Sequence, residues 1–126
     1  MSYINKPGKT TAWRKNVLNN LVADVILYEK IETNLSMAKS LTKLLAKLVG
    51  YAKQDTLHSR RMALRYLVNK KNIMADDSNK EKLSIINKLF TDLGKRYQKR
   101  QGGYSRITKL NLRRGDNSLR VIFSLV

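Results

Sequence analysis

The spacing of apolar residues changes along the chain, and this change most limits the folds open to it. Before Gly94, apolar residues recur mostly every three or four positions, which is the period of a helix face. After Gly94 they alternate with polar residues, most clearly at Leu119, Val121, Phe123 and Leu125, which is the period of a half-buried strand. Helices followed by strands in one short chain predict a two-layer α+β fold, with the helices packed on one face of a small sheet.

The expected order is a helix, a strand, three helices and two strands. Thr10 or Thr11 can cap the first helix, because a threonine hydroxyl accepts a hydrogen bond from an otherwise unpaired amide. Apolar and polar residues alternate over residues 29–35, which predicts a short strand. Ser36 can then cap a second helix, whose apolar face extends to Ala52.

A third helix is predicted to end at about residue 68. Asp55 or Thr56 can cap its start. The apolar spacing places Leu57 and Leu64 on its buried side. Its arginines are then expected to project into solvent.

The fourth helix and the hairpin have their own boundary signals. The capping-box pattern at residues 78–81 predicts the start of a fourth helix, and Gly94 is its predicted stop, because glycine is the usual residue just past a helix end. Residues 104–113 and 119–125 are predicted strands, joined by turn residues at 114–118. The apolar residues of the first strand fall on both faces, which predicts a bulge or a twist.

The composition indicates a folded domain with a polyanionic partner. The chain has 126 residues, enough for one domain, and 42% of them are hydrophobic. It carries 26 Lys and Arg residues against 9 Asp and Glu residues, a net charge of +17. Such a surface repels itself unless a partner such as nucleic acid neutralises it. We expect a basic N-terminal arm over residues 1–9 and a single domain over residues 10–126.

The same sequence argues against an enzyme, a membrane protein and a secreted protein. It has no cysteine, its one histidine is His58, and no pair of acidic residues has the spacing of a metal site or an acid–base pair. It has no phosphate-binding loop of the G-x-x-x-x-G-K kind and no dinucleotide fingerprint. No apolar run approaches the roughly 20 residues of a spanning helix, and no signal-peptide pattern is present. We expect a soluble intracellular protein without catalysis, cofactor, metal, small-molecule ligand or membrane insertion.

The strongest functional signal is the segment from Lys95 to Arg106. It holds five cations, two tyrosines and the pair Gly102-Gly103, and no acid occurs anywhere between Asp92 and Asp116. Arginine matches phosphate with a planar fork, tyrosine offers a flat face to a base, and glycine permits close backbone approach and positive φ. These features favour nucleic-acid contact over a merely solvated surface, with an affinity that falls steeply with salt.

The distribution of the cations favours RNA over DNA. They are spread over the arm, several helices and the hairpin rather than gathered on one recognition element, which suits an irregular folded RNA. Arg14 and Lys15 fall in the first turn of a helix, where the dipole disfavours cations, so a phosphate contact and a solvated position stand as equal alternatives. For the row Lys39, Lys43 and Lys47, a solvated face is favoured over a phosphate-tracking stripe.

Several short sequence motifs are spread along nearly the whole chain. The strongest runs from Lys88-Leu89-Phe90 through Asp92-Leu93-Gly94 and Arg96-Tyr97 to Arg100-Gln101-Gly102-Gly103-Tyr104-Ser105-Arg106-Ile107, and it continues with Lys109 and Arg113-Arg114-Gly115-Asp116. Upstream stand Gly8-Lys9-Thr10-Thr11, Arg14-Lys15, Ile31-Glu32-Thr33, Leu35, Ala38-Lys39, Leu41 and Arg60-Arg61 with Ala63-Leu64. With Ser105 in place of a threonine, this combination resembles the L-seventeen family of bacterial large-subunit ribosomal proteins.

The resemblance implies a structural component of the large ribosomal subunit that takes part in translation in the bacterial cytoplasm. It implies binding to large-subunit rRNA near the peptide exit region, beside neighbouring ribosomal proteins. By match of position, and with Lys99 added from the acid-free segment, the implied rRNA-facing residues are Lys9, Thr10, Arg14, Lys15, Lys39, Arg60, Arg61, Arg96, Lys99, Arg100, Gly102, Gly103, Tyr104, Arg106, Lys109, Arg113 and Arg114.

The chain departs from the family pattern at both ends and at Trp13. Ser2-Tyr3-Ile4-Asn5 replaces a basic opening, so contacts of the arm with RNA are expected to be fewer or different. Trp13 replaces a histidine and either stacks on a base or packs at the start of its helix, the second being favoured. Arg120 and Ser124 replace mostly apolar or acidic residues, so a protein neighbour of the last strand would be contacted differently.

An rRNA-binding ribosomal protein is the leading hypothesis. The runner-up is a free nucleic-acid-binding protein of another class, such as a small architectural or regulatory DNA binder, and an interaction protein with an acidic partner is a distant third. Sedimentation of a cell lysate separates the first two, because a ribosomal protein travels with large subunits at moderate salt.

Overall fold

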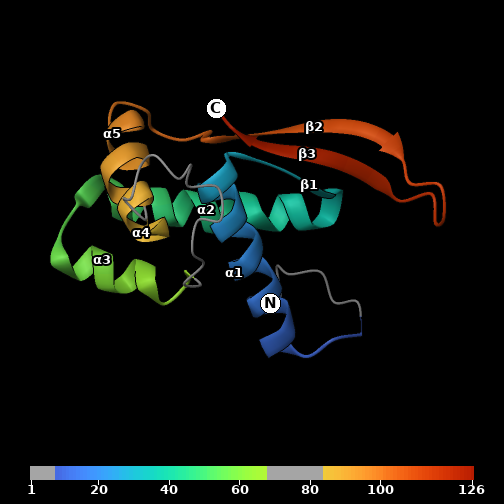
Figure 1. Ribbon diagram of the computed structural model, residues 1–126, viewed down its shortest axis with the longest axis horizontal. Coiled ribbons are helices and arrows are strands. Elements are labelled where there is room, and N and C mark those ends of the chain that lie inside the picture. Colours follow the sequence, from blue (N-terminus) through green and yellow to red (C-terminus); the bar gives the residue numbers. More distant parts are fainter. Residues whose placement is uncertain (1–7, 68–83) are drawn as a thin grey trace, which may run out of the picture.

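The computed structural model describes residues 8–67 and 84–126 (Figure 1). Along the chain come α1 (Thr11–Tyr28), β1 (Lys30–Asn34), α2 (Leu35–Gln54), α3 (Leu57–Leu64), α4 (Ile85–Lys88), the π-helical turn η1 (Leu89–Leu93), α5 (Gly94–Arg96), β2 (Ser105–Leu112) and β3 (Leu119–Leu125). α4, η1 and α5 follow one another without a break and form one helix. The predicted α+β class and the predicted order of elements are therefore confirmed.

The three strands form one antiparallel sheet in the order β1-β3-β2, so β3 is its central strand. Phe123 of β3 pairs with Ile31 of β1 on one side and with Ile107 of β2 on the other. The register shifts between Lys109 and Leu112, where two residues of β2 lie opposite one residue of β3. The irregularity predicted for this strand is therefore a β-bulge.

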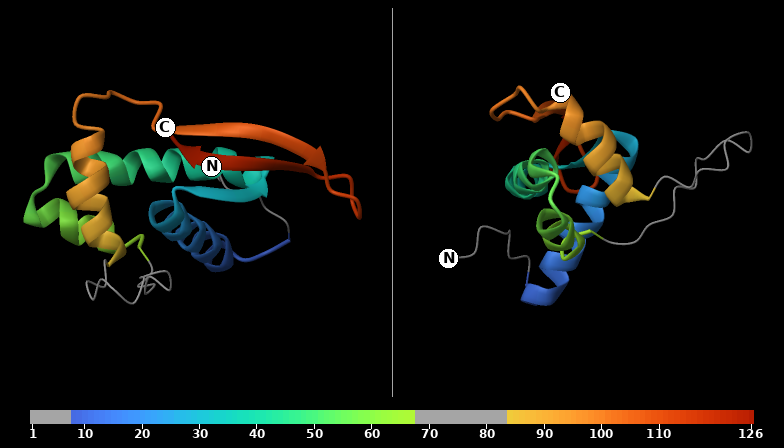
Figure 2. Two further views of the ribbon diagram at one scale, coloured as in Figure 1. Left: turned by 45° about the horizontal axis from the view of Figure 1, so that its top comes forward. Right: turned by 90° about the vertical axis from the view of Figure 1, so that its left-hand side faces the viewer.

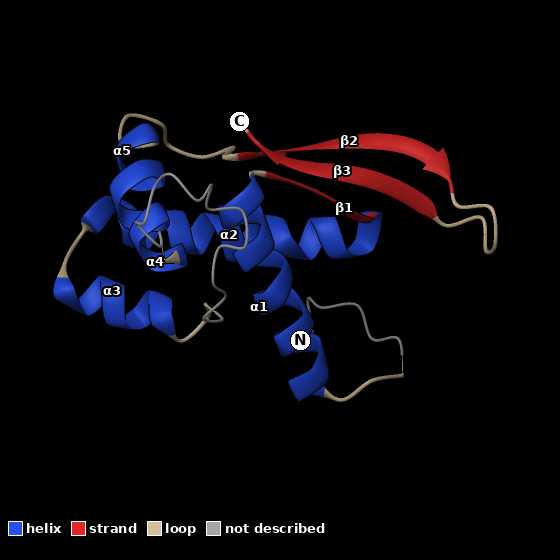
Figure 3. Ribbon diagram, viewed as in Figure 1, coloured by secondary structure: helices blue, strands red, loops and turns tan. Residues whose placement is uncertain are grey.

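α2 is the helix on which most other elements pack. It contacts all three strands as well as α1, α3, η1 and α5. Figure 3 shows α2 running beneath the strands, and the two views of Figure 2 show the helices gathered on one side of the sheet. Leu41, Leu45 and Leu48 of α2 and Val121 and Phe123 of β3 are at most 1% exposed and belong to one apolar core. The predicted layering of helices on one face of a small sheet follows from this packing.

Two of the predicted helix caps are present and one is wrong. Thr10 at the start of α1 and Thr56 at the start of α3 each accept a hydrogen bond from the backbone N–H three residues later. α2 begins at Leu35 with Asn34 as its N-cap residue, and no side chain caps it. Ser36 therefore lies inside the helix and does not cap it. The strand β1 runs directly into α2, which leaves no turn in which a serine cap could form.

α3 is shorter than predicted and turns a different side inward. It ends at Leu64, and the predicted end lies outside the described residues. Leu57 and Leu64 are 65% and 55% exposed, so the prediction that they are buried is wrong. Ser59 and Ala63 are buried instead, because their small side chains let α3 lie close to its neighbours. Ser59 is buried without an unpaired hydroxyl, since it donates to the Thr56 carbonyl at 2.8 Å.

Gly94 does not end the fourth helix, contrary to the prediction. Its backbone is helical, with φ −58° and ψ −44°, and the helix continues to Arg96. A Cβ at this position would lie 2.9 Å from the carbonyl oxygen of Ala52, so glycine is required here for close packing of the helix on α2. The capping box predicted at residues 78–81 lies outside the described residues, and Ser84 caps the described helix.

Candidate nucleic-acid interface

The predicted RNA-facing residues lie in separate regions of the molecule (Figure 1). One region is the start of α1, and a second is the far end of α2, where α3 and α5 pack. A third is the β2–β3 hairpin, whose turn extends past the end of the helices. Lys39 stands apart from these regions, exposed near the start of α2. The predicted set is therefore not one continuous patch.

The start of α1 presents accessible groups beside one buried arginine. Arg14 is 8% exposed, and its guanidinium donates to the Lys9 carbonyl at 3.1 Å and to the Thr11 hydroxyl at 3.0 Å. It therefore fastens the residues before α1 to the helix. Lys9 and Lys15 are exposed, and the Lys9 ammonium lies 5.7 Å from the centroid of the Trp13 ring. That ring is 40% exposed and remains accessible from one side.

On α3, Arg60 is bound within the protein, whereas Arg61 is exposed. Arg60 donates to Asp55 Oδ1 from Nε at 3.1 Å and from Nη2 at 2.8 Å. Its guanidinium also lies 5.0 Å from the centroid of the Phe90 ring. Arg61 is exposed and forms no ion pair with a described residue. Arg60 joins α3 to the helix that carries Phe90, whereas Arg61 is accessible to a partner.

Arg96 of α5 forms an ion pair that joins α5 to the end of α1. Its two terminal nitrogens each donate to the Glu29 carboxylate at 3.0 Å, and one also donates to Asp92 at 3.3 Å. Lys88 donates to the Leu27 carbonyl at 2.8 Å and lies 3.5 Å from Glu29. The hydrogen bonds from Arg96 hold the pKa of Glu29 below its usual value. Much of the charge of Arg96 is therefore balanced within the protein.

The loop from Arg100 to Tyr104 is fastened to α2 through its backbone. Lys53 of α2 donates to the Arg100 carbonyl at 2.8 Å, and the Tyr104 hydroxyl donates to the same carbonyl at 3.2 Å. Arg100 Nε donates to the Gly102 carbonyl at 3.1 Å. Gly102 and Gly103 have φ values of 132° and 60°, so the prediction that this pair adopts positive φ is confirmed. These hydrogen bonds hold the loop against the end of α2 and leave Arg100 and Gly103 exposed.

Only one of the two tyrosines of the basic segment is accessible to a base. Tyr97 is 2% exposed, its hydroxyl donates to the Val126 carbonyl at 2.8 Å, and its ring meets Tyr104 edge to face at 5.2 Å. The prediction of a flat face for stacking is therefore wrong for Tyr97, because the apolar core covers its ring. Tyr104 is half-buried, and Lys99 between them is exposed.

The β2–β3 hairpin carries accessible cations along its length. Arg106 and Lys109 on β2 and Arg114 in the turn are exposed and form no ion pair with a described residue. Arg113 instead donates from Nε and Nη2 to the Asp116 carboxylate. These bonds, together with one from a backbone N–H of the turn, lower the pKa of Asp116 to about 2. Arg113 thus holds the turn, whereas Arg106, Lys109 and Arg114 are accessible to a partner.

Exposed cations without a described ion-pair partner form the accessible part of the predicted set. Within residues 8–67 and 84–126 they are Lys9, Lys15, Lys39, Arg61, Lys99, Arg100, Arg106, Lys109 and Arg114. The arginines at positions 14, 60, 96 and 113 instead support the fold. In the described part of the chain no cluster of three potential metal ligands occurs, and none of its helices combines the length and hydrophobicity of a membrane span.

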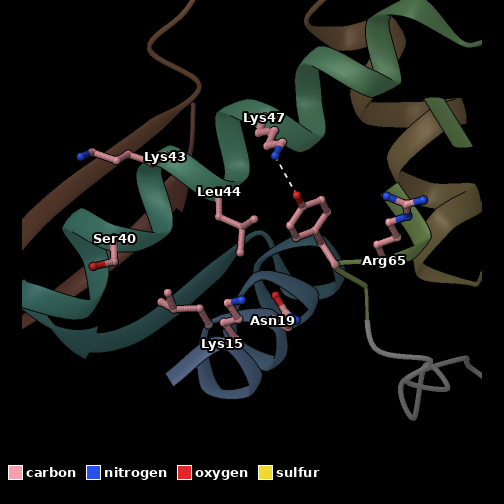
Figure 4. Close-up of a pocket in the computed structure, with 9 residues that line it drawn as sticks. Lys15, Asn19, Ser40, Lys43, Leu44, Lys47 and Arg65 are labelled. Atoms are coloured by element: carbon pink, nitrogen blue, oxygen red, sulfur yellow. Dashed lines mark hydrogen bonds between the residues drawn. The ribbon is translucent and has the colours of Figure 1, made fainter. Parts of the chain in front are cut away.

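The structure also contains a groove that sequence reasoning missed (Figure 4). It has a volume of about 510 Å³ and lies between α1, α2 and the residues that follow α3. Its lining consists of Lys15, Leu18, Asn19, Ser40, Lys43, Leu44, Lys47, Arg65 and Tyr66. The row of lysines on α2 was its one signal in the sequence. Tyr66 had none, because the sequence placed it inside a helix that was predicted to run to about residue 68, whereas α3 ends at Leu64.

Known proteins resemble this chain over its whole length. A family model described as Ribosomal protein L17 matches residues 17–126. A protein of Mesoplasma florum named "Large ribosomal subunit protein bL17" is 47% identical over 126 residues, covering all of both chains. A protein of the same name from Malacoplasma penetrans is 46% identical, again over all of both chains. One from Mycoplasma genitalium is 41% identical over all of this chain and 97% of its own length.

Proposed function

Since this chain belongs to the ribosomal protein L17 family, we propose that it is a structural component of the bacterial large ribosomal subunit, where it binds and stabilises rRNA. The observation that carries the proposal is the 46–47% identity, along the full length of this chain, with proteins that are named for that subunit. The net charge of +17 supports an RNA partner, because a polyanion relieves the repulsion among these cations. The role is structural rather than catalytic, and it belongs to translation in the cytoplasm.

The rRNA contacts of this proposal are divided between two kinds of basic residue. Exposed cations that form no ion pair with a described residue, such as Arg61, Arg106, Lys109 and Arg114, would neutralise phosphates directly. Arginines that are already paired, such as Arg96, would hold the helices in position instead. Contacts from the arm, the helix faces, the Gly-Gly-Tyr loop and the hairpin would reach an irregular RNA from several sides.

A location near the peptide exit region, among neighbouring ribosomal proteins, is the finer part of the proposal. The family resemblance of the motifs supports it. The outer face of the sheet is a surface that a protein neighbour could use, since it carries Ile122 and the ion pair between Arg120 and Glu32. Such a neighbour would need to accommodate that ion pair.

Sedimentation of a lysate from cells that produce the chain tests the proposal. At moderate salt the protein should travel with large subunits through a sucrose gradient, and ribonuclease but not deoxyribonuclease should release it. Protein that stays at the top of the gradient at moderate salt would refute the ribosomal role. Release by deoxyribonuclease would favour the alternative of a DNA-binding protein.

A further inference from the structure

The groove between α1 and α2 is surrounded by cations. Lys15 comes from α1, Lys43 and Lys47 come from successive turns of α2, and Arg65 directly follows α3 (Figure 4). No acidic residue belongs to the lining. Positive charges around a concave surface concentrate their potential there, because the protein walls screen it less than water does. The groove therefore favours an anionic ligand.

One of these cations is held in place before any ligand arrives. Lys47 Nζ donates to the Tyr66 hydroxyl at 2.7 Å and lies 4.7 Å from the centroid of the ring, and Figure 4 draws this bond across the groove. Like other lysines, Lys47 is charged at neutral pH, and the hydrogen bond to Tyr66 raises its pKa further. A side chain that is already positioned loses less rotational freedom when it binds a phosphate.

Between the cations, the groove offers apolar and aromatic surface. Leu18 is 5% exposed, Leu44 is half-buried, and both line the groove together with the half-buried Tyr66. Asn19 adds an amide that can both donate and accept hydrogen bonds. The volume of about 510 Å³ lies within the roughly 300–1,000 Å³ of sites for small ligands. A phosphate alone would leave this apolar surface unused.

Cations for a phosphate together with a ring and leucines for a base match the chemistry of a whole nucleotide. Bases inside a duplex are stacked and paired, so only a base turned out of the helix or lying in a single strand can enter such a groove. We propose that the groove receives one unpaired nucleotide of the bound RNA, with its base against Tyr66 and its phosphate against Lys47 and Arg65. This inference rests on the proposed rRNA-binding function, which itself requires only phosphate contacts elsewhere on the surface.

Titration of the full chain with two labelled hairpin RNAs tests the inference. The two RNAs share one stem, and one of them carries a single bulged adenosine. Wild-type protein should bind the bulged RNA about tenfold more tightly, since stacking of one base on an aromatic ring contributes on this scale. Tyr66→Leu should bring the two affinities to within about twofold of each other, by the same reasoning, and leave binding of the paired stem unchanged.

Matched variants test whether the ring of Tyr66 itself causes the preference for the bulged RNA. Tyr66→Phe keeps the ring and should keep the preference for the bulged RNA. Tyr28→Leu removes a different tyrosine, which belongs to α1, is 44% exposed and lies outside the groove, and this variant should also keep the preference. Loss of preference in the Tyr28 variant, or an unchanged preference in Tyr66→Leu, would overturn the proposal.

Wild-type protein provides a second measurement that does not depend on the folding of a variant. The bulged adenosine is replaced by 4-thiouridine, the complex is irradiated, and the crosslinked peptide is identified by mass spectrometry. Crosslinks to peptides that contain Lys15 to Asn19 or Tyr66 are expected. Crosslinks confined to the β2–β3 hairpin would overturn the proposal.

The remaining outcomes distinguish this inference from the function on which it rests. Equal, salt-sensitive binding of the two RNAs would refute the nucleotide site and leave rRNA binding intact. Absence of binding to either RNA would contradict both. Poly-glutamate that displaces bulged RNA as well as unlabelled bulged RNA does, but spares the paired stem, would assign the groove to an acidic peptide instead.

Discussion

Replacing Gly94 with alanine tests the contact between the α4–α5 helix and α2. Gly94 is helical, so an alanine there is free of backbone strain and should gain about 1 kcal/mol of helix propensity. The added Cβ would, however, lie 2.9 Å from the carbonyl oxygen of Ala52. That oxygen belongs to the backbone of α2 and cannot rotate away, so the two helices must separate.

The expected magnitude follows from these two opposing effects. Overpacking of a closely packed contact costs about 1–3 kcal/mol, and a backbone atom as the obstacle favours the upper part of that range. After the gain in propensity, Gly94→Ala should lower the free energy of unfolding by about 1–2 kcal/mol. Gly50 of α2 is the matched control, because a Cβ there would meet nothing within 4 Å. Gly50→Ala should therefore raise the free energy of unfolding by about 0.5–1 kcal/mol.

Urea denaturation followed by circular dichroism at 222 nm measures both variants against the wild type. Equal slopes of the transitions would show that the same surface is exposed in each case. In thermal unfolding the two variants should shift the midpoint in opposite directions, by roughly 4 °C for each kcal/mol. If Gly94→Ala proves as stable as Gly50→Ala, the close contact with Ala52 is not what requires glycine at this position.

Three further perturbations address the basic segment and the packing beneath it. Replacing both Arg100 and Arg106 with alanine should weaken rRNA binding and reduce the slope of log affinity against log salt concentration by about 2, and unchanged binding would exclude the segment as a contact. Glu29→Gln should lower the free energy of unfolding at pH 7 by about 1 kcal/mol, a modest value because the pair with Arg96 is partly exposed. Folding lowers the pKa of Glu29, so the stability difference between the wild type and Glu29→Gln should be fully present above the ordinary pKa of 4.5. The difference should vanish as the pH falls through the lowered pKa. Urea curves that differ by the same amount at every pH would contradict this prediction. Tyr97→Phe should cost about 1 kcal/mol in the same assay through loss of a buried hydrogen bond, and an unchanged urea midpoint would contradict this.

The elements set by local periodicity were predictable from the sequence. The alternation that ends in Leu125 predicted β3, and the turn residues before it predicted the hairpin. The errors are tertiary in origin. Gly94 was interpreted by the usual rule for helix ends, but its role depends on Ala52, which is remote in the sequence. The buried side of α3 was misassigned because the small side chains of Ser59 and Ala63 pack against neighbouring elements, while bonds to Thr56 satisfy the buried hydroxyl of Ser59.

For the candidate interface, the sequence identified which residues are basic but not which of them are accessible. Glu29 pairs with Arg96, and Lys53 binds the carbonyl of Arg100, although each pair is far apart in the sequence. Only the folded chain brings such partners together. The groove was hidden for the same reason, because its two walls belong to different helices and Tyr66 follows a third.

The strand order β1-β3-β2 has a consequence for the time at which the fold can form. Both outer strands are made before the central one, so neither has a partner until the ribosome has added the residues of β3. Lys30 of β1 can pair with its partner Ser124 of β3 only after nearly the whole chain has been made. Pairing over such a separation is slow, because a long loop must close before any contact stabilises it. During synthesis the helices can therefore assemble early, and the sheet closes last.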